Sequence, residues 1–564
     1  MFGACLLNRP AVRAGRMCRR QLLAKAQGIG KAQFSTSIHP KSKFYVTQPI
    51  FYVNSEPHIG HFYTMVLSDT IKRFADLCGK TTKLSSGTDE HGQKIQQAAD
   101  LANEPPLDFC TRYSDKFRSL AVAANTSATD FIRTTSDDHH TAVRKFWQRL
   151  VDGGFIYKGE HSGWYAVSDE AYYTSTQVEE RVNDKGESGM YAIESGKRVE
   201  WVSEVNYKFR MSVFGERLLK WIEENPSVIY PAVRRNEVLG WLRMGLEDLS
   251  VSRPRNRQQW GISVPGDPDH TIYVWVDALI NYLTVDGFAQ SDVLPFFPPD
   301  VQVVGKDIVR FHAVYWPALL MAANLPLPRR ILAHAHWTMG AQKMSKSIGN
   351  VADPFVDIER FGVDALRYFI VRNGGIADDG DYSNDEVIVR YKKDLVGQLA
   401  NLAARCLSER LGADLNVFAR IGREQLDHAE PGDIALRDML VALPDRVHVL
   451  FEQGEFGRGL ALVFDALAVA NKHVTENEPW LMVKQAPVPE RLQVVLFYSL
   501  EAVRLASIML MPVMPIKAAH LLDHLDITDN ERMWTDARFG AGWQPLDRLR
   551  QSKPGVAQLF PKLE

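Results

Sequence analysis

The chain has 564 residues, of which 45% are hydrophobic and 24% are charged, and its formal net charge is −2 at pH 7. A chain of this length is too long for one hydrophobic core, so two to four domains are expected, and the composition is ordinary for a soluble globular enzyme. The five cysteines are widely separated and include no Cys-x-x-Cys pair, which argues against a disulfide scaffold and against a cysteine zinc site.

The opening segment, residues 1–43, is basic. It holds nine of the 66 Lys and Arg residues and no acidic residue, and the first carboxylate of the chain belongs to Glu56. Its basic residues alternate with Leu and Ala, and Ser and Thr lie near its end, which is typical of a mitochondrial transit peptide. A disordered arm that binds nucleic acid is the alternative. We favour the transit peptide, and therefore the mitochondrial matrix, because an import helix is amphipathic.

From residue 44 to about 155, short β-rich runs alternate with helical patterns. KFYVTQPIFYV (43–53) is predicted to form one strand, a helix is predicted to follow it, and TTKLSSGTD (81–89) is predicted to form a second strand. Such an alternation indicates a parallel sheet with crossover helices. The same pattern returns at 301–337, whereas the Gly- and Tyr-rich stretch 156–227 between the two halves has the look of an insertion.

The segment His58-Ile59-Gly60-His61 follows the first predicted strand and opens a helix. A helix N-terminus binds anions through its unpaired N–H groups, and Gly60 lets a nucleotide approach the backbone closely. The two imidazoles, at i and i+3, share one helical face and can donate hydrogen bonds to phosphate oxygens. Taken alone, the motif also fits core histidines or two ligands of a metal ion, although no third ligand lies at a suitable spacing.

A second motif, Lys343-Met344-Ser345-Lys346-Ser347, is predicted to lie in a loop just past a strand, between Gly340 and Gly349. Two ammonium groups and two hydroxyls suit a pyrophosphate whose charge grows in a transition state. A solvated pair of lysines in a loop is the alternative reading of this motif by itself.

After about residue 390 the strand pattern ends and apolar residues repeat at helical spacing, which predicts a helical bundle. Its most apolar tract, 492–514, is interrupted by Gln493, Glu501 and Arg504 and is predicted to be a buried helix that prolines end. No run of 18 apolar residues occurs, so a membrane is not among the expected partners.

The two motifs together, with their chain order and their predicted place on the two halves of a split parallel sheet, resemble the class I aminoacyl-tRNA synthetases. In that family both motifs bind ATP. The resemblance therefore implies catalytic roles for the residues His58, Gly60, His61, Lys343 and Lys346, and a contact of Ser345 with the nucleotide. No protein base is needed, because the amino-acid carboxylate is already an ionised nucleophile, and catalysis is positioning plus charge stabilisation. ATP with Mg²⁺ is the implied cofactor.

This resemblance implies an α/β fold, namely a split Rossmann-type parallel-sheet catalytic domain with an inserted connective peptide and a C-terminal α-helical anticodon-binding bundle. The predicted parts are a targeting peptide (1–43), the first catalytic half (44–155), the insertion (156–227), the second catalytic half (228–349), a stem-contact linker with the KMSKS loop at its start (350–395) and the helical domain (396–564).

Over most of residues 44–515 the sequence is similar to the methionyl enzymes of this class. The segments PIFYVNSEPHIGH, TDEHGQKI, TIYVWVDALINY and GKDIVRFH carry the similarity. By this resemblance the residues that line a methionine pocket are Ile50, Tyr52, Asp89, Trp275, Ala278, Tyr282 and His312. Asp307 is implied to lie near the ribose of ATP, and Arg253 close to the reacting groups. Aromatic walls with one hydroxyl suit an unbranched, polarisable thioether.

Two features depart from the pattern of many methionyl enzymes. Leu279 stands where many relatives have proline, which reshapes the rim of the predicted pocket without changing the expected substrate. The insertion lacks the cysteine knuckles of the zinc-bearing relatives, so no structural zinc is expected there, and its Tyr and Trp residues are expected to hold it instead. Because homocysteine is only one methyl smaller than methionine, an editing activity is plausible.

The expected reaction is the activation of L-methionine with ATP to methionyl-adenylate, with release of pyrophosphate, followed by transfer of methionine to the 3′-terminal adenosine of tRNA(Met). Beyond residue 43 the chain is net acidic, so its affinity for RNA must come from local patches. Asn401 and Arg405 are predicted to be a solvent-facing polar pair, and Trp480 follows a turn. By the resemblance these three residues read the CAU anticodon, with the tryptophan stacked on an unpaired base. The alternative is a buried Trp480 and a surface ion pair of Arg405. The protein is expected to be a monomer.

Three rival functions remain open. Another class I synthetase, such as a leucyl, isoleucyl or cysteinyl enzyme, lacks support because large editing insertions and zinc-ligand cysteines are missing. A small-molecule nucleotidyltransferase shares the H-x-G-H loop but not the KMSKS loop or the helical domain. An RNA-binding splicing or scaffolding protein on a retired synthetase fold would not need intact His58, His61, Lys343 and Lys346.

Overall fold

The computed structural model describes residues 42–167, 171–182, 188–193, 195–344, 350–414, 417–418, 420–421, 429–541, 543 and 559–563. The basic leader lies outside the described residues apart from its last two positions. Its predicted role in import therefore stays a prediction.

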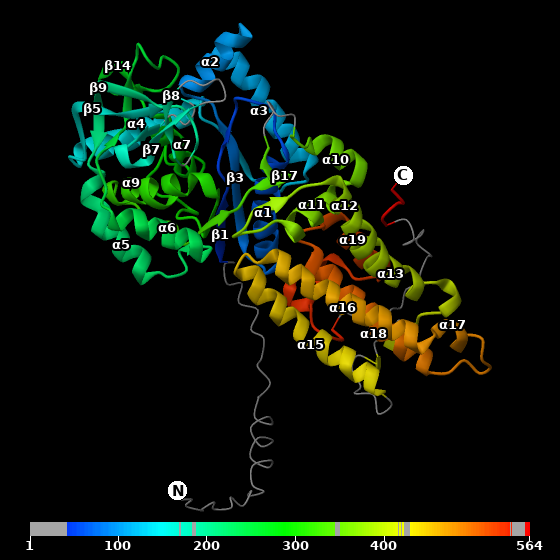
Figure 1. Cartoon of the computed structure of the whole chain (residues 1–564). Coiled ribbons are helices and arrows are strands. Elements are labelled where there is room, and N and C mark those ends of the chain that lie inside the picture. The colour runs from blue at the N-terminus through cyan, green and yellow to red at the C-terminus, as the bar shows by residue number, and fades with distance from the viewer. Residues whose placement is uncertain are drawn as a thin grey trace, which may run out of the picture. The chain divides into compact units, whose positions relative to one another are not determined.

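A parallel β-sheet lies at the centre of the catalytic part (Figure 1). Its strands are β1 Lys43–Thr47, β2 Phe51–Tyr52, β3 Thr81–Asp89, β4 Asp130–Arg133, β10 Ile229–Tyr230, β15 Val301–Gly305 and β16 Ile331–His334. They run in the order β10-β16-β15-β1-β3-β2, with β4 also paired to β3, and all these pairings are parallel. The strand candidate 81–89 is confirmed to the residue, and β15 opens the pattern that returns at 301.

The first predicted strand is wrong in one respect, because residues 43–53 form two strands rather than one. β1 pairs with β15 and β3, whereas β2 pairs only with the last two residues of β3. Gln48, Pro49 and Ile50 separate them. Proline has no N–H to donate to a neighbouring strand, so the ladder is interrupted there.

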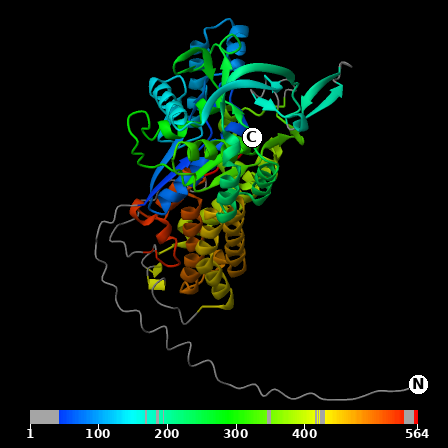
Figure 2. The same ribbon diagram turned by 90° about the vertical axis from the view of Figure 1, so that its left-hand side faces the viewer.

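Helices cover the faces of this sheet, as expected for a parallel sheet that is buried on both sides (Figures 1 and 2). In the first half they are α1 Ile59–Leu77, α2 Gln93–Ala102, α3 Pro106–Ala123 and α4 Asp137–Asp152. In the second half they are α6 Ala232–Arg243, α7 Val274–Leu279, α8 Asn281–Thr284, η3 Lys306–Ile308, η4 Phe311–Tyr315 and α9 Trp316–Ala322.

Antiparallel strands interrupt the two halves. They are β5 Ile156–Ala166, β6 Ala171–Tyr173, β7 Val178–Val182, β8 Ser188–Ala192, β9 Glu200–Phe209, β11 Leu249–Ser250, β12 Ser252–Pro254, β13 Ser263–Val264 and β14 Asp267–Ile272, with η1 Ser175–Gln177, η2 Met211–Phe214 and α5 Gly215–Glu224. The long pair β5–β9 has cross-strand neighbours Trp164 and Trp201, whose rings meet edge to face at 5.4 Å. Aromatic residues therefore do hold this segment, as expected.

The segment after β16 forms a small separate sheet from β17 Trp337–Met339, β18 Gln342–Lys343 and β19 Gly380–Asp381. Lys343, the first residue of the KMSKS motif, ends β18 of this second sheet. The motif is predicted to lie in a loop just past a strand, and its residues from Ser345 onward lie outside the described residues. Helices α10 Pro354–Phe361, α11 Val363–Asn373 and α12 Asn384–Arg390 follow.

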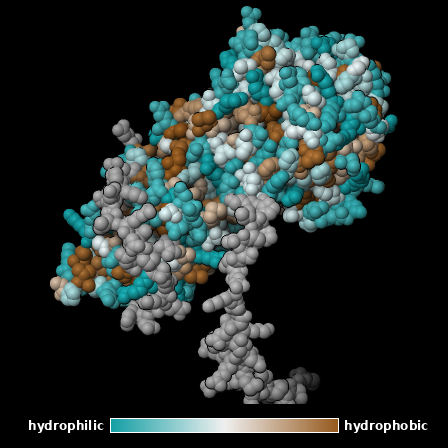
Figure 3. Space-filling view, turned by 180° about the vertical axis from the view of Figure 1, so that it is seen from behind, coloured by the Kyte–Doolittle hydropathy of each residue, from teal (hydrophilic) through white to brown (hydrophobic). Residues whose placement is uncertain are grey.

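The last third is a helical bundle, as predicted. It contains η5 Tyr391–Ala400, α13 Asn401–Cys406, η6 Glu409–Leu411, α15 Pro431–Glu452, α16 Phe456–Asn477, α17 Pro479–Met482, α18 Arg491–Leu510, α19 Pro515–His524, η7 Asp529–Glu531 and η8 Trp534–Asp536. The apolar helix α18 is long enough to cross a membrane, but nearly all of it is buried among its neighbours. Figure 3 shows mainly hydrophilic residues on one face of the molecule, as expected when the apolar side chains pack inside.

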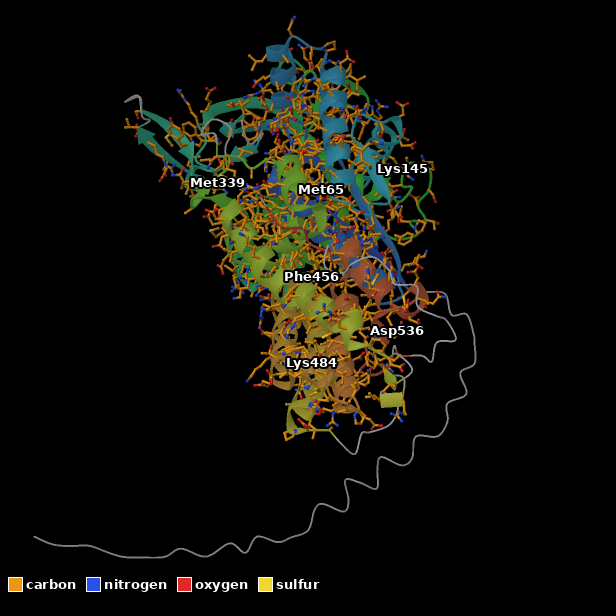
Figure 4. The ribbon with its side chains drawn as sticks, turned by 90° about the vertical axis from the view of Figure 1, so that its right-hand side faces the viewer. Met65, Lys145, Met339, Phe456, Lys484 and Asp536 are labelled. Carbon is orange, nitrogen blue, oxygen red and sulfur yellow. The ribbon has the colours of Figure 1, made fainter. Side chains whose placement is uncertain are left out.

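Helix α1 joins the sheet to the bundle. Its buried Asp69 accepts a hydrogen bond of 2.6 Å from Arg367 of α11, which also donates to the carbonyl oxygen of Val513. One and a half turns further, Phe74 packs edge to face against Phe451 at 5.4 Å. Figure 4 shows Met65 of α1 at the level of Met339, which comes shortly before the KMSKS motif, and above Phe456, the first residue of α16. The predicted fold, α/β with a parallel sheet and a helical C-terminal region, is confirmed.

Candidate active site

The N-terminus of α1 is capped by histidine instead of the usual Ser, Thr, Asp or Asn. Nδ1 of His58 accepts a hydrogen bond from the backbone N–H of Gly60 at 3.1 Å, and Nδ1 of His61 accepts one from the backbone N–H of His58 at 3.1 Å. Because both Nδ1 atoms are acceptors, a neutral ring carries its proton on Nε2. Each imidazole is thus a donor on its outer edge, as phosphate binding requires.

The two rings stack on each other, with centroids 3.8 Å apart. His61 also meets Phe51 and Phe117 edge to face, at 5.3 and 5.0 Å. A Cβ at Gly60 would lie 2.9 Å from Cε1 of His58. Glycine is therefore needed here for the cap itself, in addition to the predicted approach of a nucleotide.

The sheet order places this helix next to a topological switch point. β1 lies between β15 and β3, so the chain leaves the sheet in opposite directions from the neighbouring strands β1 and β15. Ligands of open α/β sheets bind at such a point, outside the carboxyl ends of the strands. Asp307 lies two residues after the end of β15, its carboxylate is 57% exposed, and its Oδ1 lies 3.1 Å from Nε2 of His336. An exposed carboxylate at this edge suits the hydroxyls of a ribose.

The KMSKS hairpin leads back to the same edge. β17 and β18 are joined by Gly340 and Ala341, both with φ near +60°, the left-handed conformation of a tight hairpin turn. Ser345 and Lys346 lie outside the described residues, as does the side chain of Lys343. Just beyond the loop, the carbonyl oxygen of Ala352 accepts a hydrogen bond of 3.2 Å from the backbone N–H of Ile59. The chain thus returns from the loop to the histidine-capped end of α1.

Helix α1 is also fixed to β16, the strand before the hairpin. The hydroxyl of Thr64 lies 3.0 Å from Nε2 of His334, and Nδ1 of the same ring lies 2.8 Å from the carbonyl oxygen of Ala335, so Nδ1 carries the proton. Burial lowers the pKa of His334 to about 4. This histidine is therefore neutral at physiological pH.

Two members of the predicted methionine pocket bond directly to each other. The hydroxyl of Tyr282 donates to Nε2 of His312 at 2.8 Å, while Nδ1–H of His312 donates to the carbonyl oxygen of Ile308 at 2.9 Å. Burial lowers the pKa of His312 to about 4 and raises the pKa of Tyr282. Both side chains are thus neutral, which suits the wall of a pocket for an uncharged thioether.

Trp275 adds an aromatic wall beside this pair. Its ring stacks on Phe311 with centroids 3.7 Å apart and meets His312 at 6.4 Å and 90°. The carbonyl oxygen of Ala278 accepts a hydrogen bond of 2.6 Å from Asn281, and the following Leu279 is buried in the core of the second half. Leu279, which stands where many methionyl enzymes have proline, is therefore a core residue and does not lie on the rim of the predicted pocket.

Tyr52 and Asp89 lie side by side, as register partners of β2 and β3. The negative charge of Asp89 contributes to the raised pKa of Tyr282, after the larger effect of burial, which brings this carboxylate near the Tyr282–His312 pair. Ile50 is half-buried in the turn before β2. Its predicted contact with methionine stays a prediction.

Arg253 is wholly buried. Its guanidinium lies over the rings of Tyr273, Tyr172 and Tyr165, at 4.5, 4.9 and 5.3 Å, and donates to the carbonyl oxygen of Ser252 at 2.8 Å. Tyr273 comes immediately before α7, the helix of Trp275. Arg253 thus joins the antiparallel insertion to the pocket wall, and its predicted nearness to the reacting groups stays a prediction.

Sequence reasoning missed a buried carboxylate that links the pocket segments. Asp277 lies 2.6 Å from Nδ1 of His91 and 2.7 Å from Nε2 of His139. Burial alone would raise the pKa of Asp277, but the two histidines hold it well below its usual range. His91 and Asp277 belong to the segments TDEHGQKI and TIYVWVDALINY, which could have drawn attention to them, whereas no sequence signal indicates His139.

The predicted tRNA-reading residues lie in the bundle, at the end away from α1; Figure 4 shows Lys484, just after α17, at that end. Arg405 lies over the ring of Trp480 at 5.2 Å, and Trp480 is 38% exposed. Asn401 is exposed. The prediction of a solvent-facing pair is thus right for Asn401 and incomplete for the half-buried Arg405, which stacks on the tryptophan.

Metal ligands do not cluster in the part of the chain that the structure describes, since no three His, Cys, Asp or Glu side chains there are grouped so as to hold a metal ion. Residues 168–170 and 183–187 of the insertion lie outside that part. The expectation of a zinc-free insertion therefore stays a prediction.

The sequence matches a known protein family. The family model for "tRNA synthetases class I (M)" matches residues 44–407. This range includes both sequence motifs and Asn401 and Arg405.

Two relatives match along most of their length. A protein of Neurospora crassa named "Probable methionine--tRNA ligase, mitochondrial" is 43% identical, over 93% of this chain and 87% of its own. The protein of Homo sapiens named "Methionine--tRNA ligase, mitochondrial" is 39% identical, over 92% of this chain and 90% of its own. Among solved structures, methionyl-tRNA synthetase of Mycobacterium tuberculosis in complex with methionyl-adenylate matches with a TM-score of 0.82 and 38% identity, covering 92% of this chain and 100% of the other.

Proposed function

The chain belongs to the class I methionyl-tRNA synthetases, and from this membership we propose which of its residues carry out each step. It is a methionine–tRNA ligase. It activates L-methionine with ATP to methionyl-adenylate and pyrophosphate, and then transfers methionine to the 3′-terminal adenosine of tRNA(Met).

One observation carries the assignment of the activation site. The hydrogen bond from the backbone N–H of Ile59 to Ala352 brings the chain beyond the KMSKS motif to the histidine-capped end of α1, and Asp89 at the end of β3 acts on Tyr282 of the Tyr282–His312 pair. A phosphate-binding helix end, a loop with two lysines and a neutral aromatic pocket are what a reaction between ATP and an apolar amino acid requires.

In the first step, a carboxylate oxygen of methionine attacks the α-phosphorus of ATP, and the bond to pyrophosphate breaks. His58 and His61 donate through Nε2–H to phosphate oxygens, and Asp307 accepts from the ribose. Lys343, Ser345 and Lys346 stabilise the charge that grows on the departing pyrophosphate. If Mg²⁺ accompanies ATP, it would supply further charge neutralisation beside the groups that His58, His61 and the two lysines contact.

Methionine lies against the wall formed by Ile50, Tyr52, Trp275, Ala278, Tyr282 and His312. Asp89 holds the substrate ammonium group, since it is a carboxylate beside Tyr52 at the mouth of that wall. Arg253 acts on the reacting groups from behind the wall. In the second step a ribose hydroxyl of the terminal adenosine attacks the carbonyl carbon of the adenylate, and AMP leaves.

The tRNA is selected at the far end of the bundle. Trp480 stacks on an unpaired anticodon base, and Asn401 and Arg405 donate to base edges or phosphates. The exposed ring beneath a guanidinium supports this role, because both can stack on a base.

The site of action is the mitochondrion, which the names of the relatives support, and within it the matrix. Fusion of residues 1–45 to a fluorescent reporter tests this, and a reporter that stays in the cytosol would contradict it.

ATP–pyrophosphate exchange with each of several amino acids tests the substrate. We expect exchange with methionine and charging of mitochondrial tRNA(Met). Exchange with leucine or cysteine but not with methionine would overturn the assignment.

A further inference from the structure

The turn that carries Trp480 has a constrained backbone. Helix α16 ends at Asn477, and Glu478 then adopts φ +44°, a left-handed conformation that residues other than glycine seldom adopt. Pro479 is buried, whereas Trp480 is 38% exposed. The direction of the tryptophan ring thus depends on whatever holds Asn477 and Glu478 in place.

Below this turn lies a carboxylate that is completely buried. Oδ1 of Asp433 accepts a hydrogen bond of 2.6 Å from Nε2 of His473, and its Oδ2 accepts one from Nη1 of Arg491 and another of 2.9 Å from the backbone N–H of Glu430. Burial alone would raise the pKa of Asp433, but these partners lower it to about 2. The carboxylate is therefore ionised whenever the protein is folded near neutral pH.

The network ends on the turn itself. Nη2 of Arg491 donates to Oδ1 of Asn477 at 2.6 Å, and Nδ2 of Asn477 donates to the carbonyl oxygen of His473 at 2.9 Å. Asp433 lies in the first turn of α15, His473 in the last turns of α16 and Arg491 at the start of α18. Three helix ends are thus joined at the place where the chain turns toward Trp480.

We infer that Asp433, His473 and Arg491 are positioning residues for tRNA recognition, which fix Asn477 so that Trp480 presents its ring, with Arg405 over it, to an anticodon base. The inference rests on the proposed anticodon role of Trp480. None of the three residues needs to touch the RNA.

Arginine has a specific part in this arrangement. Its fork of N–H groups bonds to Asp433 with one nitrogen and to Asn477 with another, whereas a lysine at the same place has one ammonium group on a flexible stem. Arg491→Lys therefore keeps the charge next to the buried carboxylate but loses the link to the turn. Asn477→Ala cuts the same link and leaves the ion pair of Arg491 and Asp433 in place.

The test uses the full-length chain and its two half-reactions. Trp480→Ala, Arg491→Lys, Asn477→Ala and the double variant Trp480→Ala/Arg491→Lys are compared with Arg532→Lys. This control changes another largely buried arginine, which pairs with Asp523 and bonds to the carbonyl oxygen of Ile527. ATP–pyrophosphate exchange, the KM and kcat for charging of tRNA(Met) and the thermal midpoint are measured for each variant.

We expect Trp480→Ala to raise the KM for tRNA(Met) at least about fivefold, the range given by loss of one stacked base. Arg491→Lys and Asn477→Ala raise it by several-fold, with kcat and exchange unchanged, and the double variant is little worse than Trp480→Ala alone. The control leaves the KM unchanged.

The possible contradictions are distinguishable. If Trp480→Ala leaves the KM for tRNA(Met) unchanged, the proposed anticodon role of Trp480 is wrong, and the positioning inference that rests on it is wrong as well. If Trp480→Ala raises that KM but neither Arg491→Lys nor Asn477→Ala does, only the positioning network is overturned. It is also overturned if the effects in the double variant multiply, or if exchange falls together with charging.

Discussion

At the scale of single residues, glycine at position 60 serves both the cap of α1 and the predicted approach of a nucleotide. His58 accepts a hydrogen bond from the backbone N–H of Gly60 and stacks on His61, and Gly60 has no Cβ that would push the ring of His58 away. The sequence predicted the glycine for access of a nucleotide. The structure adds that the imidazole itself needs the space, which no local pattern could show.

Replacing Gly60 with alanine should therefore damage activation. The new Cβ would lie 2.9 Å from Cε1 of His58, so the ring must shift away from the position in which it meets a phosphate oxygen. Loss of one such donor in the transition state lowers the rate about 100-fold. ATP–pyrophosphate exchange measures this loss.

Gly240→Ala in α6 is the matched control, since a Cβ there meets nothing within 4 Å. It should leave exchange unchanged and stabilise the fold by about 0.5–1 kcal/mol, the difference between Ala and Gly inside a helix. Equal exchange rates for the Gly60 and Gly240 variants would refute the steric argument.

The buried histidines predict how stability depends on pH. The pKa of His312 and of His334 is about 4 in the folded chain, compared with 6.5 for an ordinary histidine. The unfolded chain therefore binds more protons below pH 6.5, so this stability is present above pH 6.5 and is lost as the pH falls toward 4. Each histidine contributes on the order of 1.4 kcal/mol per pH unit in that window.

Urea unfolding at pH 7 and pH 5 measures the effect. We expect the unfolding midpoint to fall at pH 5, and to fall less for His334→Asn, which removes one of these titrating groups. A wild-type midpoint that is the same at both pH values would show that these histidines titrate alike in the folded and unfolded chains.

At the scale of elements, α1 depends on a charged residue in its middle. Asp69 is buried, and Arg367 from α11 reaches it while also bonding to the carbonyl oxygens of Val513 and Ala124. Burial alone would raise the pKa of Asp69, but Arg367 and Arg73 hold it below its usual value. One arginine thus joins α1, the segment after α3 and the segment after α18.

Arg367→Met should destabilise the fold by about 3–5 kcal/mol, because it leaves a buried carboxylate without its main partner. Arg329→Met is the control, since that arginine is 66% exposed and pairs with Asp300 at the surface. It should cost less than about 1 kcal/mol. Urea denaturation gives both values, and similar losses for the two variants would contradict this account.

Local patterns predicted most of the elements but not all their limits. The local pattern was enough for β15, whose sequence VQVVG is a short run of β-forming residues, and the strand candidate 81–89 matches β3. It failed at residues 43–53, where Pro49 interrupts a run that otherwise has strand composition. The small sheet of the KMSKS hairpin was not predicted, because it includes β19 from about 40 residues further along the chain.

At the scale of the whole molecule, the proposed tRNA-recognition site lies apart from the proposed activation site. Figures 1 and 4 show α17 and Lys484 at the end of the bundle away from α1. The helices of the bundle would then separate amino-acid activation from anticodon recognition. A substitution at one site should therefore leave the other site intact.

Lys346→Ala tests this separation from the activation side. We expect ATP–pyrophosphate exchange to fall at least about 100-fold, because a charge opposite the departing pyrophosphate is lost, while the Kd for tRNA(Met) stays within about twofold. A filter-binding assay gives the Kd. Unchanged exchange would show that the assignment of the KMSKS lysine is wrong.

By itself, the sequence determined the fold class and the family. It also indicated the helix that His58 opens and the segments from which a pocket is built. Each of these depends on neighbours in the chain, such as a strand followed by a histidine-glycine turn or apolar residues at a helical period.

Only the tertiary structure decided how distant segments meet. It placed Arg405 over Trp480, joined His91 and His139 through Asp277, buried Arg253 among tyrosines and returned Ala352 to the end of α1. The physical reason is that these contacts join residues far apart in the chain. Their geometry follows from packing of the whole core, which the order of neighbouring residues does not specify.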